Sequence, residues 1–181
     1  MVTANFVRTL FLVLLFVAGS SGGNAEIIDS ASNGFTVKTK VEISAPPAKV
    51  YSALVSEVGR WWDSAHTFSR DSRNLYIEGK AGGCFCERLS TGGGVHHMTV
   101  VFAAPEKLLR MTGGIGPLQE LAVTASMTWK LSQTEKGTDL EASYRVGGYH
   151  PAGLDKLAPA VDSVFVAQVL RLKNYIETGK P

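Results

Sequence analysis

Six short strand-like segments follow one another between residues 75 and 147, and turn residues separate them. They cover residues 75–80, 84–91, 95–102, 108–112, 123–133 and 139–147. Within the last two, apolar residues alternate with polar ones, which predicts strands that bury one face. Glycines at 82–83 and 92–94 supply tight turns. We therefore expect an antiparallel meander in which each strand pairs with the next.

Other elements precede and follow this meander. Residues 35–43 alternate as one further strand, which Pro46-Pro47 ends. From residue 48 to Trp62, apolar residues recur every three or four positions, so we expect an amphipathic helix that Gly59 interrupts. Residues 159–178 predict a long final helix, the one large element left to cover the apolar sheet face. The expected fold class is α+β, a curved antiparallel sheet of about six to seven strands wrapped around that helix, with a ligand cavity between them.

The first 25 residues differ in composition from the rest. Arg8 precedes nine apolar residues, Leu10 to Ala18, and small residues follow as far as Ala25. This pattern is typical of a secretory signal peptide cleaved after Ala25, with a retained anchor as the alternative. Nine apolar residues are too few to span a bilayer, which takes about 20. We expect one domain over residues 26–181, periplasmic or secreted, with no stable membrane insertion after signal removal.

Charge and cysteine content bound the function further. The chain has 18 Lys and Arg against 16 Asp and Glu, which gives no electrostatic basis for a nucleic-acid partner. Cys84 and Cys86 would be about 6.6 Å apart in a regular strand, near the upper limit for a disulfide. That spacing favours a reduced pair, although an exported protein could oxidise it. Cys-x-Cys lacks the usual zinc spacing, and His96 and His97 diverge on a strand, so we expect no metal and no cofactor.

The glycine run 92–94 suggests a register for the hairpin around it. With Gly92-Gly93 as a two-residue turn, Leu89 faces His96, Glu87 faces Met98 and Phe85 faces Val100, all on one face. A bulged turn of three glycines would shift this pairing by one position. Glu87 and His96 are then candidate polar groups in an apolar wall, as a general acid–base pair, a structural hydrogen bond or a solvent-facing pair near the end of the hairpin.

Aromatic residues complete the candidate ligand-binding set. Trp62 ends the first helix, Trp129 and Tyr144 lie on inward strand positions, and Phe165 lies on the apolar stripe of the last helix. The apolar segment 113–118 could form a lid over the cavity. The predicted ligand-binding residues are Trp62, Phe85, Glu87, Leu89, His96, Met98, Trp129, Tyr144 and Phe165.

The chain resembles the SRPBCC superfamily, the START-like or birch-pollen-allergen helix-grip fold, over about residues 33–179. The likeness lies in the motifs Ala45-Pro46-Pro47, Val58-Gly59-Arg60-Trp61-Trp62, Gly82-Gly83-Cys84-Phe85-Cys86-Glu87, Ala104-Pro105-Glu106-Lys107-Leu108-Leu109-Arg110 and Leu172-Lys173-Asn174-Tyr175-Ile176. It is similar to the branch that includes the C-terminal domain of the chaperone-ATPase activator, and to polyketide cyclases.

The resemblance implies a hydrophobic ligand held between sheet and long helix, but it carries no catalytic motif. The leading hypothesis is an exported protein that binds a small hydrophobic or lipid-like molecule. One alternative is a cyclase-like or hydrolytic enzyme that uses Glu87 and His96 as acid and base. The other is a periplasmic protein-interaction module, whose cavity would be filled by its own side chains.

Overall fold

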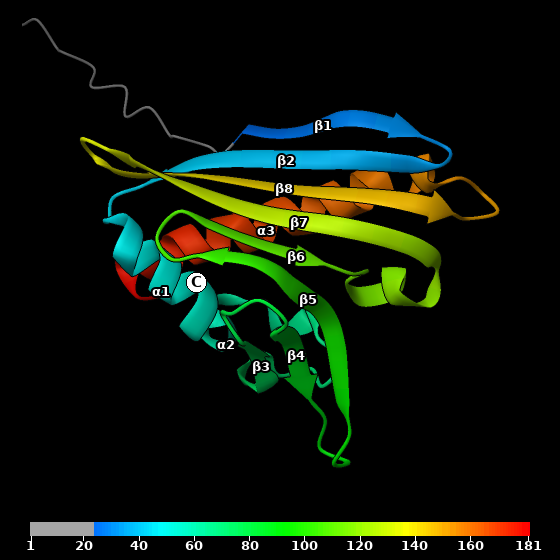
Figure 1. Cartoon of the computed structure of the whole chain (residues 1–181), viewed down its shortest axis with the longest axis horizontal. Coiled ribbons are helices and arrows are strands. Elements are labelled where there is room, and N and C mark those ends of the chain that lie inside the picture. The colour runs from blue at the N-terminus through cyan, green and yellow to red at the C-terminus, as the bar shows by residue number, and fades with distance from the viewer. Residues whose placement is uncertain (1–23) are drawn as a thin grey trace, which may run out of the picture.

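The computed structural model describes residues 24–181, which form one eight-stranded antiparallel sheet around a long helix (Figure 1). The strand order is β1-β2-β8-β7-β6-β5-β4-β3. The strands are β1 (Asn24–Ala31), β2 (Gly34–Ile43), β3 (Leu75–Ile77), β4 (Cys84–Arg88), β5 (Gly94–Ala104), β6 (Leu108–Thr112), β7 (Ala122–Thr134) and β8 (Gly137–Tyr149). The helices are α1 (Pro47–Ser56), α2 (Val58–Trp61) and α3 (Ala158–Thr178), with short 3-10 turns η1 (Ser64–His66), η2 (Ser72–Asn74), η3 (Gly116–Glu120) and η4 (Leu154–Lys156). The predicted α+β helix-grip fold is confirmed.

The edge strand β1 was not expected from the sequence. It pairs with β2, and a register irregularity separates Ile27 from Asp29. Ile27 and Ile28 are both exposed, so β1 lacks the apolar–polar alternation that marks a half-buried strand. The predicted signal peptide lies outside the described residues except for Asn24 and Ala25, the first residues of β1. Cleavage after Ala25 would therefore remove the start of this strand.

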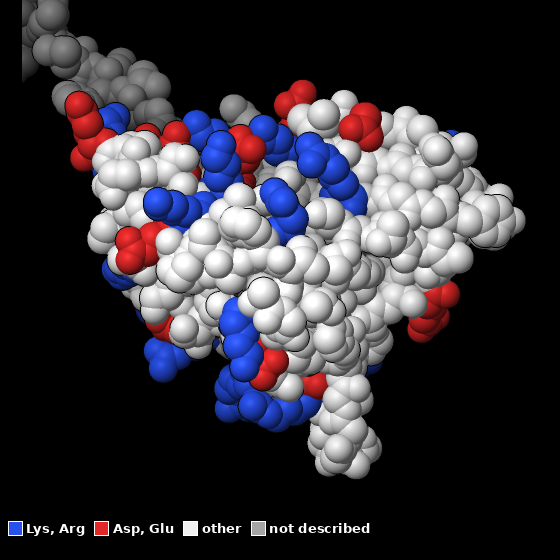
Figure 2. All heavy atoms as spheres, in the orientation of Figure 1, with Lys and Arg blue, Asp and Glu red and all other residues white. Residues whose placement is uncertain are grey.

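The chain path places the first and last strands of the expected set side by side. β2 pairs with β8 from Gly34↔Gly147 to Ile43↔Thr138, and α1 and α2 then carry the chain to β3 at the far edge. On the outer face, ion pairs join Lys38 to Glu141 and Lys40 to Asp139. Figure 2 shows basic and acidic side chains interspersed over this part of the surface. The polar half of each alternating strand thus faces solvent.

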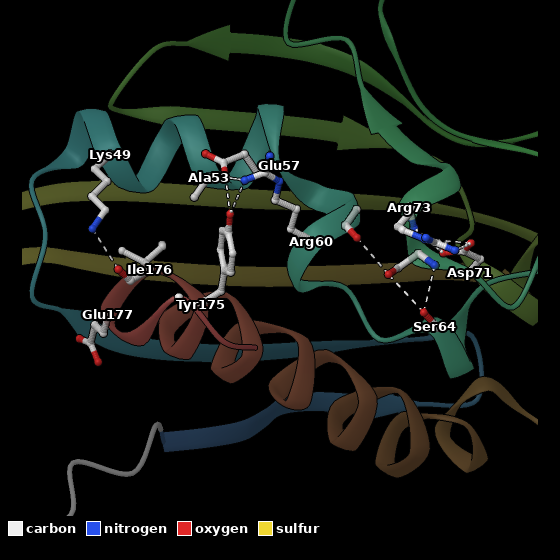
Figure 3. A pocket seen from close by; sticks show the side chains of 13 residues that line it. Lys49, Ala53, Glu57, Arg60, Ser64, Asp71, Arg73, Tyr175, Ile176 and Glu177 are labelled. Atoms are coloured by element: carbon white, nitrogen blue, oxygen red, sulfur yellow. Dashed lines mark hydrogen bonds and ion pairs between the residues drawn. The ribbon is translucent and has the colours of Figure 1, made fainter.

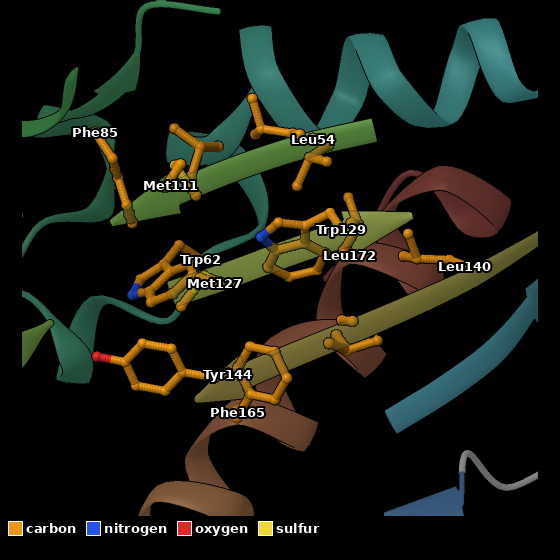
Figure 4. Packing of buried hydrophobic residues seen from close by; sticks show 14 of the residues in the cluster. Leu54, Trp62, Phe85, Met111, Met127, Trp129, Leu140, Tyr144, Phe165 and Leu172 are labelled. Atoms are coloured by element: carbon orange, nitrogen blue, oxygen red, sulfur yellow. The ribbon is translucent and has the colours of Figure 1, made fainter. Parts of the chain in front are cut away.

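The core lies between the inner face of the sheet and α3. The helix buries residues spaced at three and four positions, namely Ala158, Phe165, Gln168, Val169, Leu172 and Ile176. They meet strand residues that are almost fully buried, among them Met127, Trp129 and Leu140 (Figure 4). Among residues 24–181, none of the helices has both the length and the hydropathy needed to cross a bilayer.

Gly59 brings α2 close to the segment before β3. A Cβ atom at this position would lie 2.8 Å from the backbone oxygen of Ser72, closer than real Cβ contacts allow. The Ser72 hydroxyl donates a hydrogen bond to the Gly59 carbonyl oxygen at 3.0 Å, so the two backbones are held together. The predicted interruption of the helix occurs at Glu57, between α1 and α2. Gly59 itself is helical, and the close approach explains why the residue there is glycine.

Candidate functional site

Most of the predicted site residues lie in or beside one aromatic cluster on the inner face of the sheet (Figure 4). The ring of Trp61 lies 5.5 Å from that of Trp62 and 6.3 Å from that of Trp129. Trp62 in turn lies 5.5 Å from Phe85. We define the aromatic cluster as Trp61, Trp62, Phe85, Trp129, Tyr144 and Phe165. All six are at most 6% exposed, and the predicted residue Met98 is 0% exposed.

The helix α3 closes the cluster from the side opposite the sheet. Phe165 lies 5.8 Å from Trp129 and 6.2 Å from Tyr144, measured between ring centroids. The hydroxyl of Tyr144 accepts a hydrogen bond from the Ile115 backbone nitrogen at 3.1 Å and donates one to the Gly113 oxygen at 3.3 Å. Burial raises the pKa of Tyr144 to about 12. The predicted lid segment is therefore tied to the cluster through this hydroxyl.

Two hollows of the described residues lie away from the predicted site. One is a groove of about 870 Å³ between α1, α2 and the end of α3, where Tyr175 points towards Glu57 and Arg60 (Figure 3). The other, of about 540 Å³, lies beside Pro47 and Leu131. Neither is lined by a residue of the aromatic cluster. The residues that were expected to line a ligand cavity are instead buried and pack against one another.

The predicted hairpin register is wrong. Leu89 and Gly93 form the last pair, since the Leu89 nitrogen donates to the Gly93 oxygen, and the loop has three residues that end in Gly92 with φ +83°. This loop replaces the expected two-residue turn. Further along, Phe85 faces Met98 while Cys86 faces His96, which leaves His97 as an extra residue in β5. Such a bulge lets both His97 and Met98 point inward.

The pairing of Glu87 with His96 is therefore wrong as well, and the neighbouring histidine takes that place. His97 Nε2 lies 3.0 Å from Glu87 Oε2, whereas His96 is exposed and contacts the Thr99 hydroxyl at 2.9 Å. Leu89 lies just past β4 and is half-buried. Sequence alone could not choose between adjacent histidines, because the choice depends on the bulge.

Glu87 is an ionised carboxylate in a buried position. It is 1% exposed and accepts hydrogen bonds from the backbone nitrogens of Phe68 and Ser69 as well as from His97. Burial opposes its charge, but these hydrogen bonds outweigh burial and hold the pKa of Glu87 below its ordinary value. The donors Phe68 and Ser69 belong to the irregular segment 63–74, whose sequence has no periodic pattern from which this role could be predicted.

His97 is neutral and has one ring nitrogen unused. Burial lowers the pKa of His97, and the attraction of Glu87 only partly offsets it. Because Glu87 accepts, Nε2 carries the proton, and Nδ1 is left as a hydrogen-bond acceptor. Nδ1 is buried and has no hydrogen-bond partner among residues 24–181. The ring lies 5.2 Å from Phe85 and 5.9 Å from Phe68, so it adjoins the aromatic cluster.

The prediction of reduced cysteines is wrong. Cys84 and Cys86 form a disulfide, with their Cα atoms 5.5 Å apart instead of the 6.6 Å assumed for a regular strand. The difference accompanies the β4–β5 bulge, which bends the pairing at Phe85 and Cys86. His96 lies beside them, with a ring nitrogen and the two sulfurs within 4.8 Å of one another. In this state the sulfurs are bonded to each other and do not offer thiolate ligands.

Comparison with known proteins places this architecture in a family. The profile described as polyketide cyclase / dehydrase and lipid transport matches residues 34–177. The chain belongs to this family. No curated protein matches the chain in sequence. The matched range of the polyketide cyclase and lipid transport family runs from β2 almost to the end of α3, and so contains the aromatic cluster, Glu87 and His97.

Solved structures share the fold of this family member at low sequence identity. A protein from Mesorhizobium loti is 19% identical with a TM-score of 0.56, over 81% of this chain and 99% of that one. CalU16 from Micromonospora echinospora is 15% identical with a TM-score of 0.59, over 88% and 86%. DynU16, a protein in the dynemicin biosynthetic locus, is 19% identical with a TM-score of 0.56, over 81% and 48%. The predicted SRPBCC resemblance is confirmed at the level of family and fold.

Proposed function

We propose that this chain binds a small apolar or lipid-like molecule within the aromatic cluster, with a polar end directed at His97. The family description names both polyketide cyclisation and lipid transport, which supports an apolar ligand held inside the fold. The side chains of the cluster are apolar, as those of ligand sites mostly are, and a ligand would enter by displacing them from their mutual contacts. In this proposal Glu87 orients His97 and does not contact the ligand.

The observation that carries the proposal is the unused Nδ1 atom of His97. A buried polar atom without a partner costs about 1–3 kcal/mol of stability. A ligand hydroxyl or amide that donated to this atom would remove the cost, while Glu87 keeps the imidazole in the required tautomer. Trp129 offers a complementary group, because its indole Nε1 is also buried with no partner in the described part of the chain.

Access to the cluster would require the segment 63–74 to move. The Asp63 nitrogen donates to Gln168 Oε1 on α3 at 2.9 Å, and the backbone of Phe68 and Ser69 donates to Glu87. These hydrogen bonds hold the segment over His97, and those from Trp62 Nε1 to the His66 oxygen and from Ser72 to the Gly59 oxygen anchor its two ends. Phe68, at the centre of the segment, stacks on the His97 ring with its outer side exposed, so movement of this residue would uncover the imidazole. We propose this segment as the gate, with the 113–118 segment as the opposite wall.

We also propose that the protein is exported. The N-terminal sequence pattern is the primary support, and the Cys84–Cys86 disulfide is a second, because disulfides persist in oxidising compartments. Expression of the full chain with N-terminal sequencing of the periplasmic, membrane and cytoplasmic fractions tests this proposal. A mature N-terminus close to Glu26 in the periplasm is expected, and an intact Met1 retained in the cytoplasm would refute export.

Native mass spectrometry of the purified full chain, followed by denaturing extraction, tests ligand binding. A copurified apolar molecule, or a thermal shift with a lipid and aromatic polyketide panel, is expected. Where a ligand is found, His97→Phe should weaken its binding about tenfold, which corresponds to the loss of one hydrogen bond. His150→Phe is the control, because its Nδ1 is also unpartnered but follows β8, away from the cluster. An empty protein with no shift would contradict ligand binding and would instead favour a protein-interaction module.

An enzyme is the second candidate, and the Glu87–His97 pair is the observation that favours it. A carboxylate that orients a neutral imidazole leaves the free nitrogen able to accept a proton from a bound substrate. The general base would then be His97 Nδ1, with Glu87 in the orienting role, in place of the predicted Glu87 and His96. Turnover of a polyketide-like substrate that is abolished in His97→Phe and unchanged in His96→Phe would establish this function over simple binding.

A further inference from the structure

The Cys84–Cys86 disulfide lies on the outer face of β4, opposite the face that carries the proposed ligand site. Phe85 and Glu87 point inward, so the alternation of the strand directs both sulfurs outward. Cys84 is partly exposed and Cys86 is 9% exposed. Cys86 pairs with Tyr76 on β3 and with His96 on β5. The bond therefore lies where a small thiol can approach it from solvent.

This disulfide has little to contribute to the stability of the fold. In the chain-entropy account, stabilisation grows with the number of residues in the closed loop, and only Phe85 separates these two cysteines. Backbone pairing on both sides already fixes the strand: Cys84 is paired with Thr99, and its nitrogen also donates to the Glu78 carboxylate at 3.2 Å. Because the sheet already fixes both positions, stabilisation of the fold does not explain the presence of this disulfide.

His96 supplies chemistry beside the sulfurs. Its side chain is exposed, one ring nitrogen lies within 4.8 Å of both sulfurs, and Nε2 contacts the Thr99 hydroxyl at 2.9 Å. A protonated imidazole at this distance can stabilise or protonate a thiolate that leaves. The Glu78 carboxylate, which accepts a hydrogen bond from the Cys84 backbone nitrogen, is a nearby negative charge that would oppose a thiolate. An accessible sulfur and a neighbouring group that can stabilise the leaving thiolate both favour thiol–disulfide exchange.

We propose that Cys84–Cys86 is an exchange-active disulfide that oxidises dithiols. A substrate thiolate attacks Cys84 Sγ, the sulfur–sulfur bond breaks, and Cys86 leaves as a thiolate that takes a proton from His96 or solvent. The second substrate thiol, after losing its proton, attacks the substrate sulfur of the mixed disulfide and displaces Cys84. The substrate dithiol loses two electrons and two protons and becomes a disulfide, while Cys84 and Cys86 become thiols.

Reduction of the folded full chain by dithiothreitol, with acid quench, alkylation and mass spectrometry, tests the proposal. The disulfide should open without loss of the near-ultraviolet circular dichroism and should re-form on removal of the reductant. A chelator is present throughout, because two thiolates and His96 would also suit a soft metal ion. Reduced ribonuclease replaces dithiothreitol in a second arm. Its oxidation would show that protein dithiols are substrates, and oxidation of dithiothreitol alone would restrict the activity to small dithiols.

Single cysteine variants test which of the two sulfurs is attacked. Cys86→Ser leaves the partly exposed Cys84, which should form a mixed disulfide with oxidised glutathione at least about tenfold faster than the Cys86 left by Cys84→Ser. His96→Gln should slow reduction of the wild-type pair several-fold, while His150→Gln, at the end of β8, leaves the rate unchanged.

A structural disulfide would behave differently in each measurement. Resistance to reduction until the chain unfolds in urea would overturn the proposal, as would equal rates for the two single variants. If a single variant aggregates, the double variant Cys84→Ser/Cys86→Ser still tests whether the fold requires the disulfide. We expect the double variant to fold with a melting temperature at most about 5 °C lower. Failure of that variant to fold would mean that the bond is required for structure, contrary to the proposal.

Discussion

His97 Nε2 lies 3.0 Å from Glu87 Oε2, and neither side chain is more than 3% exposed. The pair joins two neighbouring strands and, through the backbone of Phe68 and Ser69, the segment 63–74. A buried carboxylate with three donors is thus the point at which sheet, connecting segment and aromatic cluster meet. Its contribution to stability can be measured directly.

Replacement of Glu87 by Gln should lower the free energy of unfolding by about 2 kcal/mol, the range for hydrogen bonds to a charged group. The amide keeps the shape of the side chain but loses the charge. Its NH₂ group cannot accept a hydrogen bond, so one of the three donors would lose its acceptor. Urea denaturation measures the change, with the exposed Glu106→Gln as control, for which a change within about 0.5 kcal/mol is expected. An equal effect of the two substitutions would contradict the assigned role of Glu87.

Stability should fall as the pH falls below the ordinary histidine value. Burial holds the pKa of His97 below its usual 6.5 in the folded protein, while the unfolded chain takes up the proton near that value. The unfolded state then binds more protons, so the free energy of unfolding declines from about pH 6.5 downward. Glu87, whose pKa is lowered by its donors, adds a decline of the same sign below its ordinary 4.5.

Urea denaturation between about pH 7 and pH 5 isolates the histidine contribution, because the carboxyl contribution falls below this range. The wild-type protein should lose stability more steeply than His97→Gln, which has no ionisable group at this position. Parallel pH profiles for the two proteins would mean that His97 is not held neutral by the fold.

Two buried tryptophans should respond differently to the same substitution. Trp61 and Trp129 are each 1% exposed, but the Trp61 indole donates to the Ala53 oxygen at 3.0 Å, whereas the Trp129 indole has no partner in the described chain. Trp61→Phe should therefore cost about 1 kcal/mol more than Trp129→Phe, since it also leaves a buried carbonyl unsatisfied. Thermal and urea denaturation of the two variants provide the comparison, and the reverse order would contradict the prediction.

Gly59→Ala should destabilise the fold by about 1–3 kcal/mol, because the new Cβ would lie 2.8 Å from the Ser72 backbone oxygen. Gly93→Ala is the matched control, since its Cβ would meet only side-chain atoms at 3.8 Å or beyond. Urea denaturation should show a change within about 0.5 kcal/mol for the control. Tolerance of alanine at position 59 would mean that α2 and the 72–75 segment do not approach as closely as described.

Strand and helix order was predictable because it depends on local periodicity. The alternation in 123–133 and 139–147 matches β7 and β8 to within two residues at each end, and the spacing of apolar residues in 159–178 matches α3. β1 was missed because both faces of an exposed edge strand are accessible, so no burial pattern marks its sequence. The predicted inward positions Phe85, Met98, Trp129, Tyr144 and Phe165 are buried as expected, whereas their role in binding remains a prediction.

The sequence by itself therefore determined the α+β architecture, the meander and the helix that covers it, since each follows from the residue types along one element. Only the tertiary structure decided which histidine joins Glu87, whether the cysteines meet and what fills the interior. The choice of histidine and the approach of the cysteines depend on a three-residue loop and one extra residue in β5, because a shift of one position exchanges the two faces of a strand. Such small displacements result from the packing of distant segments, and no local sequence pattern records them.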